Sequence, residues 1–156
     1  MNQQPDAIPR SIIKLHKKYI KGSEKKALIK EFTVYVCNLT KAVKTGCSII
    51  GVKVYITTKT MKHIYDVKPA VDYDFLILHL PKLIKTPDRV CRNSSSKRGA
   101  YLFVKEVNEV IYVISVEECV ENGETCLFVA TGFRSDEDYL KKFPTIWSWR
   151  GGIPSS

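Results

Sequence analysis

One of the three histidines of this chain, His63, lies in the stretch TTKTMKHIYDVKP (residues 57–69), directly after a strand-like apolar run. Lys59, Lys62 and Lys68 surround it in the sequence. Histidine is the side chain that exchanges a proton most readily near neutral pH, and lysine can stabilise an anionic oxygen. The stretch therefore predicts acid–base chemistry beside a bound anion, with His63 as the group that moves the proton.

Further cations and a hydroxyl follow His63 along the chain. Lys105 interrupts the apolar run YLFVKEV, Arg98 lies in the polar loop before it, and Thr131 and Arg134 lie near the end of the last strand-like run. If the strands are consecutive, alternation along each strand can place Lys105 and Thr131 on one side of a sheet. Cleavage of RNA by its own 2′-hydroxyl without a metal needs a base, an acid and cations on the developing phosphorane, which this set supplies.

We therefore predict His63 as general base or acid and Thr131 as a hydrogen-bond donor to a phosphoryl oxygen in the transition state. Lys105 completes the catalytic set as a phosphate ligand, and the predicted substrate-binding residues are Lys68, Arg98 and Arg134. The sequence holds no GxGxxG, P-loop or HExxH motif and no carboxylate cluster in its basic part, so we expect no cofactor and no metal. The acidic residues of 117–124 are interpreted as solvated charges at a hairpin end.

The charge is unevenly divided along the chain. The formal net charge is +9 overall, with +5 in residues 1–31, +8 in residues 32–100 and −4 in residues 101–156. A one-sided basic field suits a polyanion such as nucleic acid, although lysine-rich helix faces also keep small proteins in solution. The five cysteines follow no zinc spacing, and we interpret Cys37, Cys119 and Cys126 as small buried residues of a protein from a reducing compartment.

The elements that must position these residues can be read from apolar periodicity and turn signals. Residues 11–31 predict two helical stretches broken near Gly22, with Ser23 as the cap of the second. Asn122-Gly123 is a strong hairpin signal, and Ser135 is expected to cap a final helix. The remaining expected elements are strands at 48–58, 101–107, 110–119 and 124–135, a strand or a continuation of the helix at 32–37, a helix capped by threonine at 58–66, a helix at 72–80, and a short helix or turn at 80–90.

This order predicts an α+β fold in which N-terminal helices are followed by a mostly antiparallel sheet of about four strands. We expect one nuclease-like domain over residues 1–156, with a basic helical part at 1–31, an α+β core at 32–143 and a C-terminal tail at 144–156. No apolar run reaches the roughly 18–20 residues that cross a bilayer, and no secretory signal is present. We therefore expect a cytoplasmic protein that does not contact membranes.

Residues 52–135 resemble the phage-type members of the barnase/EndoU/colicin/RelE-like nuclease superfamily. The resemblance rests on four ordered pieces, which are VKVYITTKTMKHI, LPKLIKTPDRV, the basic loop leading into YLFVKEV, and the strand pair VIYVISVEE and CLFVATGFRS. It implies a small α+β fold and metal-independent endonuclease or toxin activity on RNA, located in the host cytoplasm if the protein is phage-encoded. By position, His63, Lys105 and Thr131 match polar site positions of the family, and Arg98 and Arg134 match more loosely.

One departure from the family pattern leaves an alternative open. A second histidine is expected near Lys68, where this chain has lysine followed by proline. Lysine can hold phosphate but is a poor base, because its ordinary pKa is about 10.4. The alternative is a non-catalytic nucleic-acid-binding module or a phage protein-interaction module on the same fold, with Trp147 and Trp149 as anchors. RNA is the expected partner, and a cognate inhibitor or a phage protein is a further one; the sequence does not define the oligomeric state.

Overall fold

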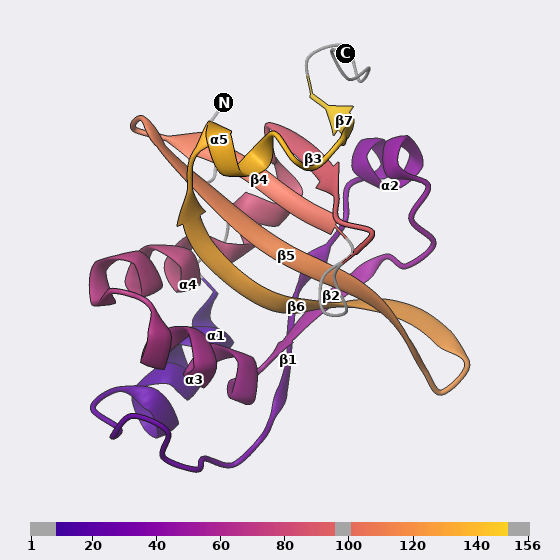
Figure 1. Cartoon of the computed structure of the whole chain (residues 1–156). Coiled ribbons are helices and arrows are strands. Elements are labelled where there is room, and N and C mark those ends of the chain that lie inside the picture. The colour runs from indigo at the N-terminus through magenta and orange to yellow at the C-terminus, as the bar shows by residue number, and fades with distance from the viewer. Residues whose placement is uncertain (1–8, 96–100, 150–156) are drawn as a thin grey trace, which may run out of the picture.

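The computed structural model of the chain describes residues 9–95 and 101–149 (Figure 1). In chain order, the elements are α1 (Arg10–Leu15), a π-helical turn η1 (His16–Ile20), β1 (Thr33–Asn38), α2 (Lys41–Cys47), β2 (Lys53–Thr57), α3 (Thr58–Val67), α4 (Ala70–Lys85), β3 (Arg89–Arg92), β4 (Tyr101–Val107), β5 (Val110–Glu121), β6 (Glu124–Ser135), α5 (Glu137–Leu140) and β7 (Thr145–Ser148).

The described strands form one seven-stranded sheet in the order β1-β2-β6-β5-β4-β3-β7. The α+β class and the antiparallel meander β4-β5-β6 agree with the sequence prediction. The prediction of about four strands, mostly antiparallel and preceded by the helices, is wrong in detail. The sheet is mixed, because β2 pairs with β6 in parallel, and β1 and β2 come before α3 and α4. The missed strands are β3 and β7, which have four residues each and are too short to show a clear alternation.

Two predicted helices also differ from the structure. Residues 21–31 contain no helix, and Ser23 does not cap one; its hydroxyl donates to Ile20 O and accepts from Lys62 Nζ. The predicted helix 72–80 and the following turn are one continuous helix, α4, with Pro81 inside it. Proline removes one intrahelical hydrogen bond, but α4 is apolar around the proline and is buried there, and this burial outweighs the loss.

The turn signals of the C-terminal half are confirmed, with one shift. Asn122 and Gly123 adopt positive φ values of 53° and 79° between the paired residues Glu121 and Glu124, as a two-residue hairpin turn requires. The cap of α5 is Asp136 instead of Ser135, since the Asp136 carboxylate accepts from Tyr139 N at 2.8 Å. Both residues suit an N-cap, and sequence does not separate neighbouring candidates.

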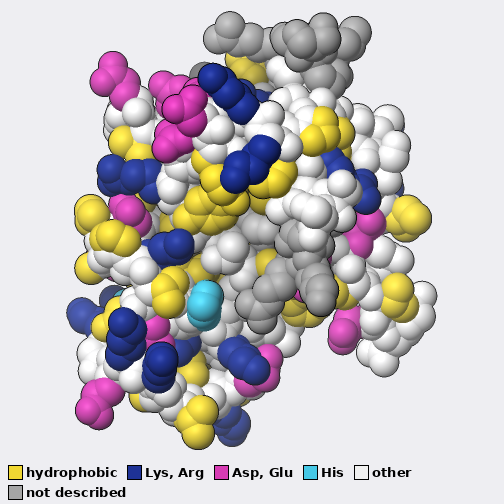
Figure 2. Space-filling view, viewed as in Figure 1, with side chains coloured by type: hydrophobic (Ala, Val, Ile, Leu, Met, Phe, Trp, Pro, Cys, Tyr) yellow, Lys and Arg dark blue, Asp and Glu magenta, His cyan; other side chains and the backbone are white. Residues whose placement is uncertain are grey.

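The two faces of the sheet differ in what covers them. On the helix-covered face, α4 packs across β1, β4, β5 and β6, and α1 and α3 pack beside it around the main core. The other face carries only the short helix α5 among the described helices, over a smaller apolar cluster that includes Leu102, Val113 and Leu140. We call this second face the open face; it faces the viewer in Figure 1, with α4 behind the sheet. In Figure 2 hydrophobic side chains gather there beneath α5, and basic side chains lie over the region of α3.

Candidate functional site

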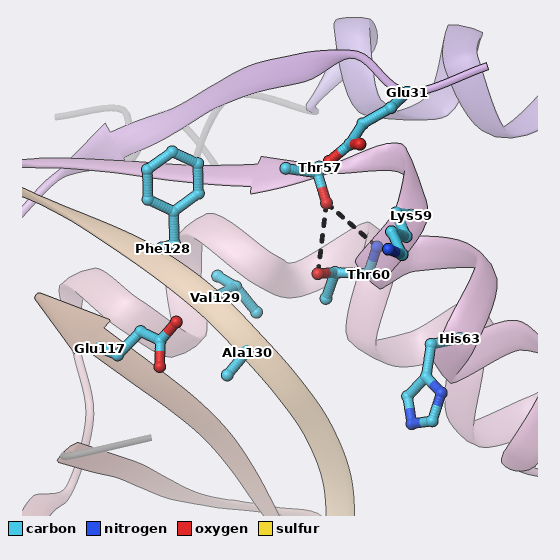
Figure 3. Close-up of a pocket in the computed structure, with 9 residues that line it drawn as sticks. All are labelled: Glu31, Thr57, Lys59, Thr60, His63, Glu117, Phe128, Val129 and Ala130. Atoms are coloured by element: carbon cyan, nitrogen blue, oxygen red, sulfur yellow. Dashed lines mark hydrogen bonds between the residues drawn. The ribbon is translucent and has the colours of Figure 1, made fainter. Parts of the chain in front are cut away.

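A hollow of about 310 Å³ lies between the first turns of α3 and the strands β5 and β6 (Figure 3). His63 and Lys59 reach it from α3, and Glu117 reaches it from β5, so that the histidine and the carboxylate stand on different walls. The full lining is Glu31, Thr57, Lys59, Thr60, His63, Glu117, Phe128, Val129 and Ala130.

Helix α3 presents its polar side to this hollow because its other side is fully buried. Met61 and Ile64 are 0% and 2% exposed, which orients Lys59 and His63, one turn apart, toward solvent. Thr57 begins the helix, and its hydroxyl accepts from Thr60 N at 3.1 Å and contacts Thr60 Oγ1 at 3.3 Å. The predicted threonine-capped helix is therefore confirmed, and its cap brings two further hydroxyls to the hollow.

The residue before His63 fixes the helix in place. Lys62 is buried, and its ammonium donates to Ser23 Oγ at 2.8 Å, to Glu24 O at 2.6 Å and to Asp66 Oδ1 at 2.7 Å. Burial raises the pKa of the Asp66 carboxyl, but the hydrogen bonds from Lys62 and from Lys26 N–H outweigh it and hold this pKa below its usual value. The result is a rigid attachment of α3 to the 21–31 segment.

The first residues of α3 also hold the segment around Glu31, which forms another wall of the hollow. Thr58 Oγ1 donates to Lys30 O at 2.8 Å and accepts from Phe32 N at 2.9 Å. These two bonds hold the backbone on both sides of Glu31, whose carboxylate lies at the rim of the hollow in Figure 3.

The sheet wall is shaped by a β-bulge. Glu117 lies opposite Phe128 and Val116 opposite Val129, but Ser115 lies opposite Thr131, so Ala130 is one extra residue in β6. Bulges bend a strand and redirect its side chains, and they are frequent beside functional sites. Here the bulge lies in the hollow itself, between Val129 and Thr131.

Glu117 is the site residue that sequence reasoning missed. It was assigned with its neighbours to a solvated hairpin end, yet it is half-buried and lines the hollow. A signal was present in VIYVISVEE: Ile114 and Val116 are apolar, and alternation puts Ser115 and Glu117 together on the opposite side of the strand.

Thr131, Lys68 and Arg134 lie along the same edge without lining the hollow. Thr131 is half-buried on the open face, one residue beyond Ala130. Lys68 ends α3, with Nζ 5.5 Å from the centre of the Phe133 ring, and it borders a shallow depression together with Arg134. Arg134 donates to Asp72 Oδ1 at 2.9 Å while half of its side chain stays exposed.

Lys105 lies on the other face of the sheet. Its ammonium donates to Thr86 O at 2.6 Å and is 3.7 Å from Asp88 Oδ1, at the C-terminal end of α4. It is in register with Tyr112, which is buried in the main core.

The expectation that Lys105 and Thr131 share a side is thus wrong, and the bulge is the reason. A regular hairpin from Asn122-Gly123 would pair Tyr112 with Phe133; the extra residue pairs it with Arg134 instead and reverses the face of Thr131. Arg98 lies outside the described residues.

Two further properties hold for residues 9–95 and 101–149. No group of three or more His, Cys, Asp or Glu side chains is arranged to hold a metal ion. No helix there has the length and apolar character needed to cross a bilayer.

Comparison with known proteins identifies one family. Residues 31–142 match the family described as phage-Barnase-EndoU-ColicinE5/D-RelE like nuclease3. The match spans β1 to α5 and includes His63, Glu117 and Thr131, and therefore both walls of the hollow. No curated protein and no solved structure matches the chain.

Proposed function

The chain belongs to the phage-Barnase-EndoU-ColicinE5/D-RelE like nuclease3 family, and on this basis we propose that it is an endoribonuclease that cuts RNA without a metal ion. The observation that carries the proposal is the hollow with His63 on one wall and Glu117 on another. An acid and a base on different sides of a bound phosphate are the minimum that in-line transfer to a 2′-hydroxyl requires.

In the proposed reaction, Glu117 accepts the proton of the 2′-hydroxyl as its oxygen attacks the adjacent phosphorus. The bond from phosphorus to the 5′-oxygen breaks, and protonated His63 gives its proton to that leaving oxygen. The products are a 2′,3′-cyclic phosphate and a free 5′-hydroxyl. The two roles open to His63, acid or base, are thereby narrowed to the acid, since the carboxylate of Glu117 on the other wall takes the role of the base.

Cations along α3 are suited to hold the RNA backbone. Lys59 lines the hollow and can face the phosphate that reacts, while the hydroxyl of Thr60 offers a hydrogen bond at its edge. Lys68 and Arg134 lie at the far end of α3, about 13 Å along the helix from Lys59, where they can contact a neighbouring phosphate.

Thr131 and Arg98 remain proposed contributors, and Lys105 does not. The Thr131 hydroxyl lies on the open face next to the hollow, and Arg98 precedes β4 in the sequence, beside Lys97. Lys105 is held by Thr86 and Asp88 on the helix-covered face, and we assign it a structural role.

The test is cleavage of a mixed RNA pool in EDTA by the wild type, His63→Ala and the matched control His79→Ala. His79 is half-buried on α4 against the Phe75 ring, away from the hollow. We expect cyclic-phosphate ends from the wild type and the control, and a loss of about 10²- to 10⁴-fold in His63→Ala. Equal rates for wild type and His63→Ala would overturn the assignment of His63.

The same experiment distinguishes the proposed nuclease from the alternative function, a module that binds nucleic acid without cleaving it. Lys68, near which the family resemblance implies a second histidine, is the feature that favours the alternative, a protein that binds nucleic acid without cutting it. That protein would leave the RNA pool intact in EDTA and bind it with an affinity that falls steeply as salt rises.

A further inference from the structure

Three aromatic side chains lie in register across the open face beside the hollow. Tyr35 of β1 pairs with Tyr55 of β2, and Tyr55 pairs with Phe128 of β6. The rings of Tyr35 and Tyr55 are 6.0 Å apart between centroids and those of Tyr55 and Phe128 are 5.6 Å apart. We call Tyr35, Tyr55 and Phe128 the aromatic row; it leads to Glu117, which pairs with Phe128 from β5.

The row reaches the surface, with Tyr35 exposed and Tyr55 and Phe128 half-buried, although its neighbours along each strand are core residues. Val34, Val54 and Leu127 are 7%, 0% and 0% exposed and point to the helix-covered face, so the aromatic residues beside them point to the open face. Tyr35 is 50% exposed, and its hydroxyl donates to Asn38 Oδ1 at 2.8 Å, which leaves the ring itself available.

Phe128 connects this row to the proposed catalytic hollow. It lines that hollow on one side and, with Tyr55, a second hollow of about 380 Å³ on the other. Glu121 and Glu124 border the second hollow, so a phosphate is disfavoured there while the uncharged face of a base is not. Lys53, exposed on the same face of β2 as Tyr55, and Lys59 in the first hollow supply cations on either side for the backbone.

We propose that the aromatic row is a stacking platform for unpaired bases of single-stranded RNA next to the cleaved bond. Every base has a π-face that stacks on an aromatic ring, and charged grooves with such rings are how proteins follow a single strand. A duplex cannot offer its base faces to a sheet surface, because they are stacked within the helix. The inference rests on the proposed function for its substrate, and it predicts a preference for unpaired strands.

The test uses binding without cleavage. An eight-nucleotide single-stranded DNA carries no 2′-hydroxyl and is not cut by the proposed reaction, so its Kd can be measured by fluorescence anisotropy on the active protein. Phe128→Leu and Tyr35→Leu are compared with the control Trp149→Leu, which changes a 61% exposed aromatic residue beyond β7, at the opposite edge of the sheet. A DNA duplex of the same sequence is measured in parallel.

We expect Phe128→Leu and Tyr35→Leu each to weaken single-strand binding by about 5- to 100-fold, with duplex binding and the control unchanged. Circular dichroism melting establishes whether each variant is folded. If Phe128→Leu is unfolded, the affinity of Tyr35→Leu, which changes an exposed residue, decides whether the platform exists. Folded variants with wild-type single-strand affinity would overturn the platform even if the wild type cuts RNA. Intact RNA together with the expected binding losses would overturn the nuclease proposal and leave the platform standing. A concentration-dependent dimer that Tyr35→Leu dissociates would assign the row to a second copy of the chain and overturn the inference.

Discussion

Two pairs of consecutive residues compare a charged or polar side chain that is turned into the protein with one that is turned to the hollow. Lys62 is buried against Ser23, Glu24 and Asp66, whereas His63 beside it is exposed at the hollow. Glu118 is turned inward, where it accepts from Ile50 N at 3.1 Å, whereas Glu117 lines the hollow.

The presence of a charged side chain therefore does not identify a residue of the site. What identifies it is that the side chain points into the hollow instead of into the protein. Inward charges are saturated by hydrogen bonds and hold the elements in position. Charges at the hollow lie where a substrate can reach them. The predictions below follow from this division, and each compares a residue on one side with a partner on the other.

The largest expected effect separates the two glutamates. Glu117→Gln removes the proposed base and should lower kcat for RNA cleavage by the folded variant by about 10²- to 10⁴-fold. Glu118→Gln weakens the bonds that tie β5 to Ile50 N and to the Tyr101 hydroxyl, and should cost about 1–3 kcal/mol of unfolding free energy with kcat retained. Single-turnover kinetics and urea unfolding of both variants measure the two effects. Wild-type kcat in folded Glu117→Gln, or a hundredfold loss of kcat in folded Glu118→Gln, would contradict the division.

The next effect concerns the buried ammonium of α3. Lys62→Met leaves Asp66 without its ion-pair partner at a site where the two side chains are 7% and 10% exposed. Breaking such a pair typically costs about 3–5 kcal/mol, because a buried charge is left uncompensated. Urea unfolding should show this loss, and Lys59→Met, changed on the exposed side of the same helix, should not. If both variants unfold at the wild-type urea concentration, Lys62 does not anchor α3.

A smaller effect tests the residue that sequence analysis placed in the site. Lys105→Met removes the hydrogen bond to Thr86 O and the contact with Asp88, and we expect a loss of about 1–3 kcal/mol of unfolding free energy. The rate of RNA cleavage by the folded variant should stay within about twofold of the wild type, because changes away from the hollow leave the acid and base in place. A hundredfold loss of kcat in folded Lys105→Met would return Lys105 to the catalytic set.

The position of Lys105 on the helix-covered face also shows how far the sequence could predict the site. Local signals were reliable: the threonine cap of α3, the Asn122-Gly123 turn and the β4-β5-β6 meander all depend on neighbouring residues. They were sufficient to place His63 on a helix after a strand and to recognise the nuclease family.

Long-range pairing was not predictable in the same way. The parallel contact of β2 with β6 and the extra residue Ala130 are decided by how distant strands pack, and one inserted residue reverses every following side chain. Sequence analysis therefore chose Lys105 as a partner of Thr131, whereas Glu117 was missed although alternation in VIYVISVEE carried a local signal for it. Both errors concern which way a strand residue points.

The smallest predicted effect is a pH dependence of stability that comes from His16. His16 lies in the helix-covered part, with Nδ1 2.9 Å from the Tyr73 hydroxyl. Burial lowers the pKa of His16 below its ordinary 6.5, Asp74 opposes this shift, and Lys21 and Lys17 add to it. The folded protein therefore binds this proton more weakly than the unfolded chain does.

The sign of the pH dependence follows from that difference. The full contribution of neutral His16 to stability is present above pH 6.5, and it is lost as the pH falls below 6.5 toward the lowered value. Melting temperatures between pH 7.5 and 5 should fall less steeply in His16→Asn, which keeps a polar group near Tyr73 but cannot titrate, than in the wild type. The carboxyl of Asp66 does not interfere, since its pKa is held below 3.8 and its contribution is lost only in stronger acid. His79, whose pKa is lowered by burial and by Lys82, contributes to the slope that His16→Asn retains. An unchanged slope in His16→Asn would show that His16 binds a proton equally well in the folded protein and in the unfolded chain. It would then contradict burial of this side chain as a cause of the pH dependence.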